Sequence, residues 1–96
     1  MDFSEALQVC KWGAKITRDN WNAPGQYVVH QNGYPEGIEV NKNTAEATGL
    51  EEGTTAKFAP YLLLHNAEGV FVPWQPTQGD VLAEDWVALN GHQLFI

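Results

Sequence analysis

Two of the four tryptophans lie in segments where an aromatic ring can serve either a ligand or the edge of the core. Trp21 and Trp74 are each flanked by Asn, Gln or Pro in segments predicted as a loop or a strand end. A ring in such a place offers a flat face for stacking on a base, a sugar or another chain. The alternative is that both rings close the edges of a small core or form a contact between subunits, and the local sequence alone slightly favours it. Trp12, at a predicted helix end, and Trp86, inside a predicted strand, are expected to pack.

Hydrogen-bonding side chains surround these two tryptophans in the sequence. Asn22 lies beside the first, and Gln75, Thr77 and Gln78 follow the second. Amide and hydroxyl groups beside an aromatic ring suit hydrogen bonds to ribose hydroxyls and base edges. The same residue types are common in turns, so this pattern alone does not distinguish a binding site from a loop.

A group of carboxylates follows this segment. Asp80, Glu84 and Asp85 have the residue types of a general acid/base pair. Such a group more often caps a short helix or faces solvent, and Asp80 is the best placed of the three to be a cap.

Other kinds of chemical site have little support. His30, His65 and His92 lack the spacing of metal ligands, and Cys10 is the only cysteine. Ser4 is the only serine and has no nucleophile-elbow setting, and there is no glycine-rich phosphate loop. We therefore expect no metal, no cofactor and no catalytic residue.

The overall charge restricts the partners. Twelve acidic and five basic residues give the 96-residue chain a net charge of −7, which disfavours duplex nucleic acid and anionic membranes. Lys11, Lys15 and Arg18 form a local basic group that suits one small anion better than a polymer.

The chain contains no apolar run long enough to span a bilayer, its first residues lack signal-peptide character, and it has no cysteine pair, so we expect a cytosolic compartment.

An N-terminal helix and a sheet must position these residues. Apolar residues recur at helical spacing from Phe3 to Cys10, Asp2 and Glu5 have the spacing of a capping box, and Gly13 is expected to end the helix. Strands are predicted over 14–18, 26–31, 59–66, 70–74 and 85–89, a short extended piece over 38–40, helical turns over 43–49 and 78–84, turns at 32–33 and 35–37, and a surface loop over 51–57. The prediction is an α+β fold in which the N-terminal helix packs on a mainly antiparallel β-sheet, with short helical turns in the loops and one ligand-binding domain over residues 1–96.

Five short motifs follow one another along the chain. They are Phe3-Ser4-Glu5-Ala6-Leu7, Lys11-x-Gly13, Arg18-x-x-Trp21-Asn22, Val72-Pro73-Trp74 and Gln78-x-Asp80-x-Leu82-Ala83-x-Asp85-Trp86. In this order they resemble the second family of Thoeris anti-defence proteins of phages and prophages. The resemblance covers roughly residues 1–86, and its Trp-Asn and Asp-Trp blocks are specific only when taken together.

The chain also departs from the family pattern. Asn20 and Ala23 stand where glycines flank the Trp-Asn pair, and Gly79 stands where a larger polar residue is usual. Changes beside a pocket are expected to alter which signal is bound or to weaken its binding.

The resemblance implies a function and an assembly. Proteins of this family sequester, without degrading it, a cyclic ADP-ribose-type signal made by a bacterial TIR-domain enzyme, so that the downstream effector stays inactive. Some relatives also hold cyclic oligonucleotide signals. The family forms homo-oligomers, typically tetramers, with ligand sites near subunit contacts, and it acts in the cytoplasm of the infected bacterial host.

On this hypothesis Trp21 and Trp74 stack on adenine, polar side chains bind hydroxyls and base edges, and Arg18, with Lys15, neutralises the diphosphate. The candidate ligand-binding residues are Arg18, Trp21, Asn22, Tyr27, Trp74, Thr77, Gln78 and Asp80. Two alternatives stay open: a hydrolase of a nucleotide signal that uses Asp80 with Glu84 or Asp85, and a structural or protein-binding module whose tryptophans contact another chain.

Overall fold

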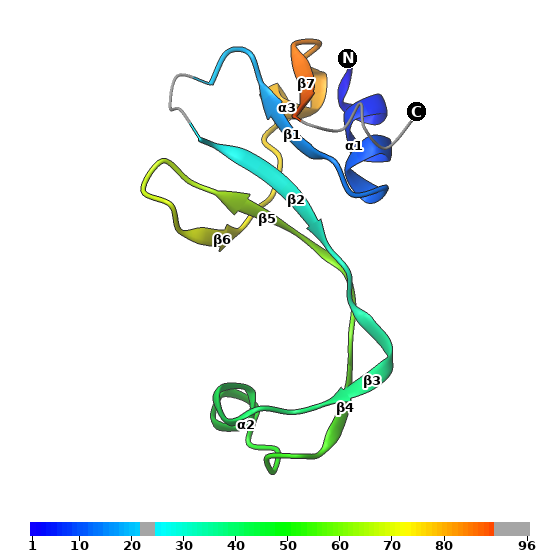
Figure 1. The fold of residues 1–96 in the computed structure, drawn as a ribbon, viewed down its shortest axis with the longest axis vertical. Helices are drawn as coiled ribbons and strands as arrows, with labels where there is room; N and C mark the ends of the chain where they lie inside the picture. Colours follow the sequence, from blue (N-terminus) through cyan, green and yellow to red (C-terminus); the bar gives the residue numbers. More distant parts are fainter. Residues whose placement is uncertain (22–24, 90–96) are drawn as a thin grey trace. The chain divides into compact units, whose positions relative to one another are not determined.

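The computed structural model describes residues 1–21 and 25–89, and it contains three helices and seven strands there. In chain order the elements are α1 (Phe3–Lys11), β1 (Lys15–Arg18), β2 (Tyr27–Gln31), β3 (Tyr34–Glu39), α2 (Lys42–Thr48), β4 (Thr55–Phe58), β5 (Tyr61–His65), β6 (Phe71–Pro73), α3 (Gln78–Leu82) and β7 (Trp86–Leu89) (Figure 1). The predicted α+β fold, with an N-terminal helix on a mainly antiparallel sheet, is confirmed.

The chain divides into two compact units. The sheet unit combines Met1–Gln31 with Leu62–Ile96, and the hairpin unit is Asn32–Tyr61. That residues 1–96 act as one ligand-binding domain stays a prediction. Within the described residues, no helix is both long and apolar enough to cross a bilayer.

The sheet unit is built on a five-stranded sheet with α1 packed on one of its faces. The strand order is β6-β5-β2-β1-β7, and β1 pairs antiparallel with both β2 and β7. Helix α1 begins at a capping box in which the side chain of Asp2 accepts from the Glu5 amide and that of Glu5 accepts from the Asp2 amide, as predicted. Two residues that pair between β1 and β2, Ile16 and Val28, point toward α1 and are fully buried.

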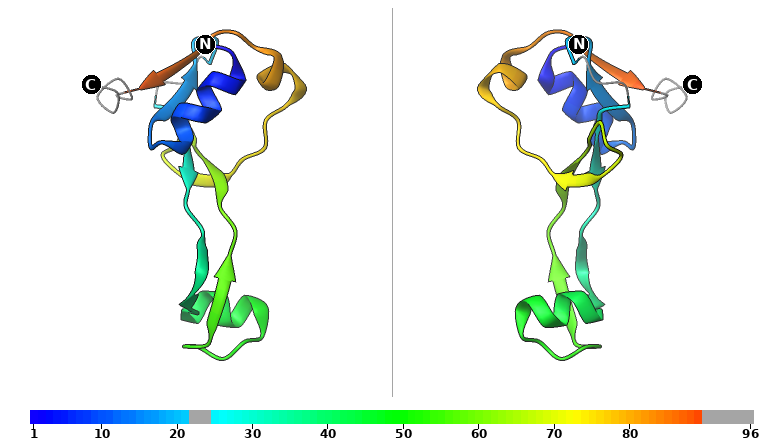
Figure 2. Two further views of the ribbon diagram at one scale, coloured as in Figure 1. Left: turned by 90° about the vertical axis from the view of Figure 1, so that its right-hand side faces the viewer. Right: turned by 90° about the vertical axis from the view of Figure 1, so that its left-hand side faces the viewer.

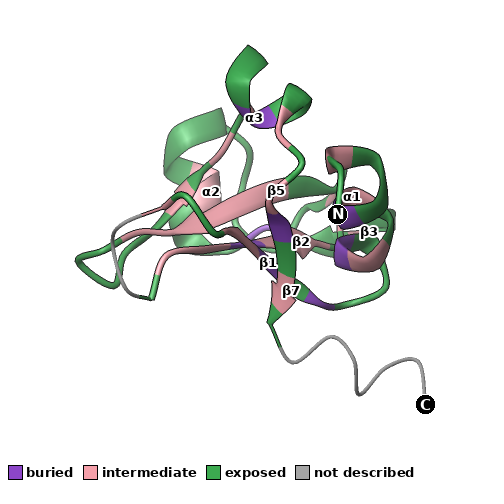
Figure 3. Cartoon of the chain, turned by 90° about the horizontal axis from the view of Figure 1, so that it is seen from above, coloured by how far each residue is buried: buried purple, intermediate pink, exposed green. Residues whose placement is uncertain are grey.

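The core under α1 is small. It consists of Ala6, Cys10, Ile16, Val28 and Trp86, all fully buried (purple in Figure 3). Burial raises the pKa of the Cys10 thiol to about 11, so this thiol stays protonated at neutral pH.

The hairpin unit is a two-stranded ribbon with a short helix. Strands β3 and β4 pair antiparallel, with Tyr34 opposite Phe58 at one end, and α2 lies in the connection between them (Figure 2). Asn41 caps the start of α2 by accepting from the Thr44 amide at 2.9 Å. Gly49 ends α2 with φ of 80°, as the predicted helix end requires.

Three sequence predictions are wrong. The turn predicted at residues 35–37 lies inside β3, where a register shift between Tyr34 and Ile38 absorbs the proline and glycine as a bulge. The loop predicted over 51–57 contains most of β4, because a short and mostly exposed strand acquires its structure from its partner β3. Trp12 does not join the core: it caps the end of α1, and its side chain is 58% exposed.

Candidate functional site

Three tryptophan rings gather within the sheet unit. Trp21 lies 5.3 Å from Trp86 and 6.4 Å from Trp74, and Trp74 lies 6.1 Å from Trp86, between ring centroids. The ring planes in these pairs are 76° to 78° apart, an edge-to-face arrangement that ring quadrupoles favour. Phe3 of α1 adds a fourth ring, 5.5 Å from Trp86. Trp21 and Trp74 are therefore neighbours within one chain.

The members of this aromatic cluster (Phe3, Trp21, Trp74 and Trp86) differ in exposure. Trp86 is fully buried, as predicted, and its indole N–H donates to the backbone oxygen of Asp80 at 2.9 Å. Trp21 and Trp74 are half-buried against the core. Each ring therefore partly closes the edge of the core, which is the role that the local sequence favoured. Each also keeps part of its surface open to a ligand.

Short backbone contacts place the two half-buried tryptophans. The amide of Trp21 donates to the carbonyl of Arg18 at 3.0 Å, in a turn directly after β1. The amide of Trp74 donates to the carbonyl of Leu62 at 3.0 Å, just beyond the β5–β6 pairing. Both rings are thus fixed by residues at strand ends, where aromatic side chains reach the rim of the core.

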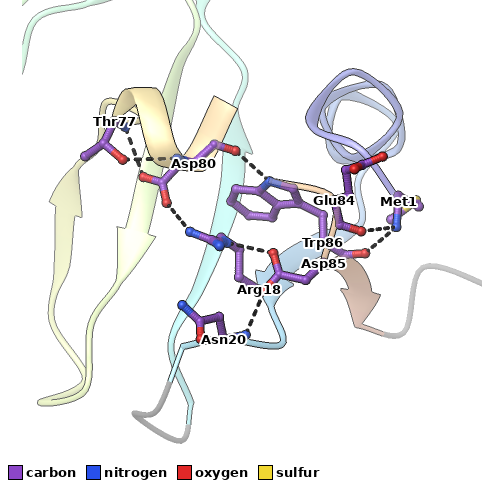
Figure 4. Close-up of polar contacts among 8 residues, drawn as sticks. All are labelled: Met1, Arg18, Asn20, Thr77, Asp80, Glu84, Asp85 and Trp86. Carbon is purple, nitrogen blue, oxygen red and sulfur yellow. Dashed lines mark hydrogen bonds and ion pairs between the residues drawn. The ribbon is translucent and has the colours of Figure 1, made fainter. Parts of the chain in front are cut away.

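An ion-pair network lies beside the aromatic cluster. Arg18 Nε donates to Asp85 Oδ1 at 2.8 Å, and Arg18 Nη1 donates to Asp80 Oδ1 at 3.0 Å (Figure 4). The amide of Asn20 donates to the second Asp85 oxygen at 2.9 Å. The side chains of Arg18 and Asp80 are only 16% and 11% exposed, so their ion pair is largely shielded from solvent, whereas the Asp85 side chain is 31% exposed.

Helix α3 holds the second carboxylate in place. Thr77, not Asp80, is the N-cap of α3: its hydroxyl accepts from the Asp80 amide at 3.1 Å, and the Asp80 carboxylate accepts from the Thr77 amide at 3.0 Å. The prediction that Asp80 itself is the N-cap is therefore wrong. Asp80 is the third helical residue of a capping box whose N-cap is Thr77.

The network keeps both carboxylates ionised. Burial acts to raise the pKa of Asp80, but hydrogen bonds from Thr77 and Arg18 outweigh it and hold that pKa below its ordinary value. The hydrogen bond from Arg18 lowers the pKa of Asp85 against a smaller opposing effect of burial, and the Asn20 amide lowers it further. The hydrogen bond that Arg18 donates to Asp85 raises the pKa of Arg18. One cation thus lies between two anions.

The structure brings together only part of the predicted site. Trp21, Trp74, Arg18 and Asp80 lie around the aromatic cluster and its ion pairs. Thr77 and Gln78 are exposed at the start of α3, the helix that carries Asp80. Asn22 lies outside the described residues.

Tyr27 and Lys15 lie elsewhere. Tyr27 precedes the buried Val28 in β2, so it points to the face of the sheet opposite α1. There its ring stacks on His65 at 4.6 Å, and the Lys15 ammonium lies 4.7 Å from its centroid. Since Lys15 and Arg18 point to opposite faces of β1, they do not converge as one basic site.

Sequence reasoning missed Phe3 and Trp86 as members of the aromatic cluster. Phe3 follows the helical spacing and Trp86 lies in a predicted strand, so the sequence predicted only a packing role for each. The adjacent Asp85-Trp86 pair was the available signal, because it places a carboxylate and a ring on one strand end. Among the residues that the structure describes, no group of three His, Cys, Asp or Glu could hold a metal ion.

Comparison with known proteins assigns the fold to a family. The family model described as the Thoeris anti-defense 2-like domain matches residues 1–89. The chain belongs to this family. It is similar to Thoeris anti-defense 2 of Bacillus phage SP01, with 29% identity over 89 residues, which cover 90% of this chain and 91% of that protein. The resemblance inferred from the ordered motifs is therefore confirmed, and the chain is a Thoeris anti-defense protein.

The family domain includes every candidate residue of the sheet unit. The match to residues 1–89 spans the aromatic cluster, the Arg18 network and α3. It also includes the whole hairpin unit, Asn32–Tyr61. The matched range therefore includes residues of both units.

Proposed function

We propose that this chain binds a cyclic ADP-ribose-type or related cyclic nucleotide signal of Thoeris defence and sequesters it without degrading it. The observation that carries the proposal is the pair of half-buried tryptophans, Trp21 and Trp74, whose ring centroids lie 6.4 Å apart. Half-buried rings on a fixed frame bind a base without losing much side-chain freedom. The site of action in this proposal is the cytoplasm of an infected bacterial cell.

The ring geometry specifies how a base would be held. The planes of Trp21 and Trp74 are 78° apart, so the two rings do not form a parallel sandwich. A purine would stack on the open face of one ring and meet the edge of the other. The exposed Thr77 and Gln78 side chains, at the start of α3, would then hydrogen-bond to ribose hydroxyls or base edges.

Arg18 has a different role in this proposal than a diphosphate clamp. Two carboxylates already surround its guanidinium, so the group of three carries a net negative charge. Arg18 therefore positions Asp80 and α3, and an additional cation is needed for the diphosphate. A second copy of the chain in a homo-oligomer, which we propose to be a tetramer, is the natural source of that cation.

Sequestration fits the carboxylates better than hydrolysis does. Asp80 and Asp85 both have a lowered pKa, which makes each a poor general acid and a weak general base near neutral pH. The backbone oxygen of Glu84 accepts from the Met1 ammonium at 3.5 Å (Figure 4). No observation therefore favours the hydrolase or the purely structural module over binding.

A depletion experiment tests the proposal. Purified protein is mixed with the cyclised ADP-ribose signal and removed by filtration, and free signal is assayed in the filtrate. We expect depletion, followed by recovery of intact signal after the complex is heated. Undiminished free signal contradicts binding, and depletion without recovery of intact signal contradicts sequestration.

A pair of tryptophan variants locates the site. Trp74→Ala removes one half-buried ring of the aromatic cluster, while Trp12→Ala removes an indole that is 58% exposed at the end of α1. We expect Trp74→Ala to weaken binding at least about tenfold, as loss of base stacking does, and Trp12→Ala to retain it. Equal binding by both folded variants would contradict the proposed site.

A further inference from the structure

The hairpin unit contains a hollow that the proposed function does not use. It has a volume of about 300 Å³, and three aromatic rings contribute to its wall: Tyr34 of β3, Phe58 of β4 and Tyr61 of β5. Tyr34 and Phe58 are directly opposite each other in the β3–β4 pairing. These rings are 44%, 37% and 49% exposed, so they surround an open concavity and do not fill it. A concave site with aromatic walls is the usual form of a small-ligand site.

Two of the residues that line this hollow already have hydrogen-bond partners. Val40 is buried, and its amide and carbonyl both bond across to the segment before β4, with Thr54 and Gly53 at 2.8 Å each. Asn41 uses its side-chain oxygen to accept from the Thr44 amide at the start of α2. These groups shape the hollow, and the ring faces and the charge of the lining remain to select a ligand.

The charge of the hollow favours a cation. Glu39 is the one charged residue among those that line it, and no Lys, Arg or His belongs to the lining. The hairpin unit as a whole carries five glutamates and two lysines. The faces of aromatic rings are themselves electronegative and attract ammonium and guanidinium groups. An anionic nucleotide would find no partner for its phosphates here.

We propose that this hollow binds an aliphatic ammonium or guanidinium group carried on a short apolar stem. The stem packs among Tyr34, Phe58 and Tyr61, and the cationic head lies against the ring faces within the field of Glu39. The group is carried by a free amine or by a lysine or arginine side chain of a protein. The proposal is independent of signal sequestration, because it involves other residues and a ligand of opposite charge.

The test follows amide resonances of the full ¹⁵N-labelled chain during titration with two probes. Putrescine represents the free amine, N-acetyl-lysine methylamide represents the side chain, and 1-butanol is the uncharged control. We expect saturable shifts confined to residues 34–61 with at least one cationic probe, and none with butanol at the same concentration. Response to putrescine alone assigns a free amine, and response to the lysine derivative alone or to both assigns a group that a protein can supply.

Matched charge variants make the test specific. Glu39→Gln and Glu36→Gln remove one charge each from β3, but only Glu39 lines the hollow. We expect Glu39→Gln to raise the apparent Kd about threefold or more. Glu36→Gln should change the apparent Kd by less than about 1.5-fold. Unchanged amide dispersion shows that each variant is folded. The proposal is overturned if neither cationic probe gives saturable shifts, if butanol binds as well, or if both variants weaken binding equally.

Discussion

The two units of this chain use similar residues in opposite ways. In the sheet unit, Trp86 is fully buried and forms the centre of a ring cluster under α1. In the hairpin unit, Val40 is the one buried apolar residue, while five large apolar side chains are exposed: Tyr34, Ile38, Leu50, Phe58 and Tyr61. Burial of apolar side chains stabilises the sheet unit. Strand pairing and helix caps contribute a larger share of the stability of the hairpin unit.

Stability and binding capacity are located in different parts of the molecule. Aromatic rings that touch edge to face bury area and hold a frame, whereas rings around a hollow leave their faces to a ligand. The charges differ as well. The aromatic cluster adjoins an arginine between two aspartates, while the hollow is lined by a single glutamate. We expect substitutions of equal size to have very unequal effects in the two units.

The largest difference is expected from removing one ring in each unit. Trp86→Ala deletes a fully buried indole together with its hydrogen bond to Asp80, and it should lower the free energy of unfolding by about 3–5 kcal/mol. Phe58→Ala deletes a ring that is 37% exposed and should cost about 1 kcal/mol or less. Urea unfolding followed by far-UV circular dichroism measures both. Similar losses in the two variants would contradict the contrast between the units.

The ion-pair network should contribute the next largest effect. Arg18→Leu leaves the nearly buried Asp80 carboxylate without its cation, and we expect a loss of about 2 kcal/mol in the free energy of unfolding. Lys15→Leu, on the same strand, removes an exposed ammonium that lies over Tyr27 and should change stability by less than about 1 kcal/mol. Urea titration at neutral pH compares the two. A larger loss in Lys15→Leu would show that the network does not stabilise the sheet unit.

Acid should weaken the same network. The pKa values of Asp80 and Asp85 are lower in the folded chain than their ordinary value of 3.8, so their contribution to stability is fully present above that value. It is lost as the pH falls through the lowered pKa values of the folded state. We expect a free energy of unfolding that is flat with respect to these groups from about pH 7 to pH 5 and falls below about pH 4. Urea unfolding across this range measures the fall, which should be shallower in Asp85→Asn than in the wild-type chain.

Much of the fold could be predicted because its signals are local. The capping box of Asp2 and Glu5, the apolar stripe from Phe3 to Cys10 and the final glycine of α2 each act within a few residues, and each is confirmed. Strand β4 could not be predicted in the same way. Thr55–Phe58 is only four residues long and mostly exposed, so its short alternation of polar and apolar residues is a weak signal until the segment pairs with β3. The bulge in β3 is also decided by that pairing and not by its Pro35 and Gly37.

The candidate site was less predictable for the same reason. The residue types were visible in the sequence, but Arg18 meets Asp80 and Asp85 from positions 62 and 67 residues away. Nothing in the sequence shows that these two carboxylates form ion pairs with the Arg18 guanidinium. Nor does it show that Tyr27 points to the opposite face of the sheet, because the register of the strands decides both.

The smallest effect is expected from substituting the glycine at the end of α2. This effect should stay within the hairpin unit, so it tests whether the two units unfold independently. Gly49 has φ of 80°, and its amide closes the helix by donating to Ala45 at 2.9 Å. A Cβ there would meet open space, so Gly49→Ala should act through backbone strain alone and cost about 1 kcal/mol. Asparagine tolerates this conformation, which makes Gly49→Asn the matched control with a smaller cost. Amide hydrogen exchange should therefore accelerate in α2 of Gly49→Ala and stay unchanged in β1 and β2. Equal acceleration in both units would mean that the hairpin unit does not unfold independently of the sheet.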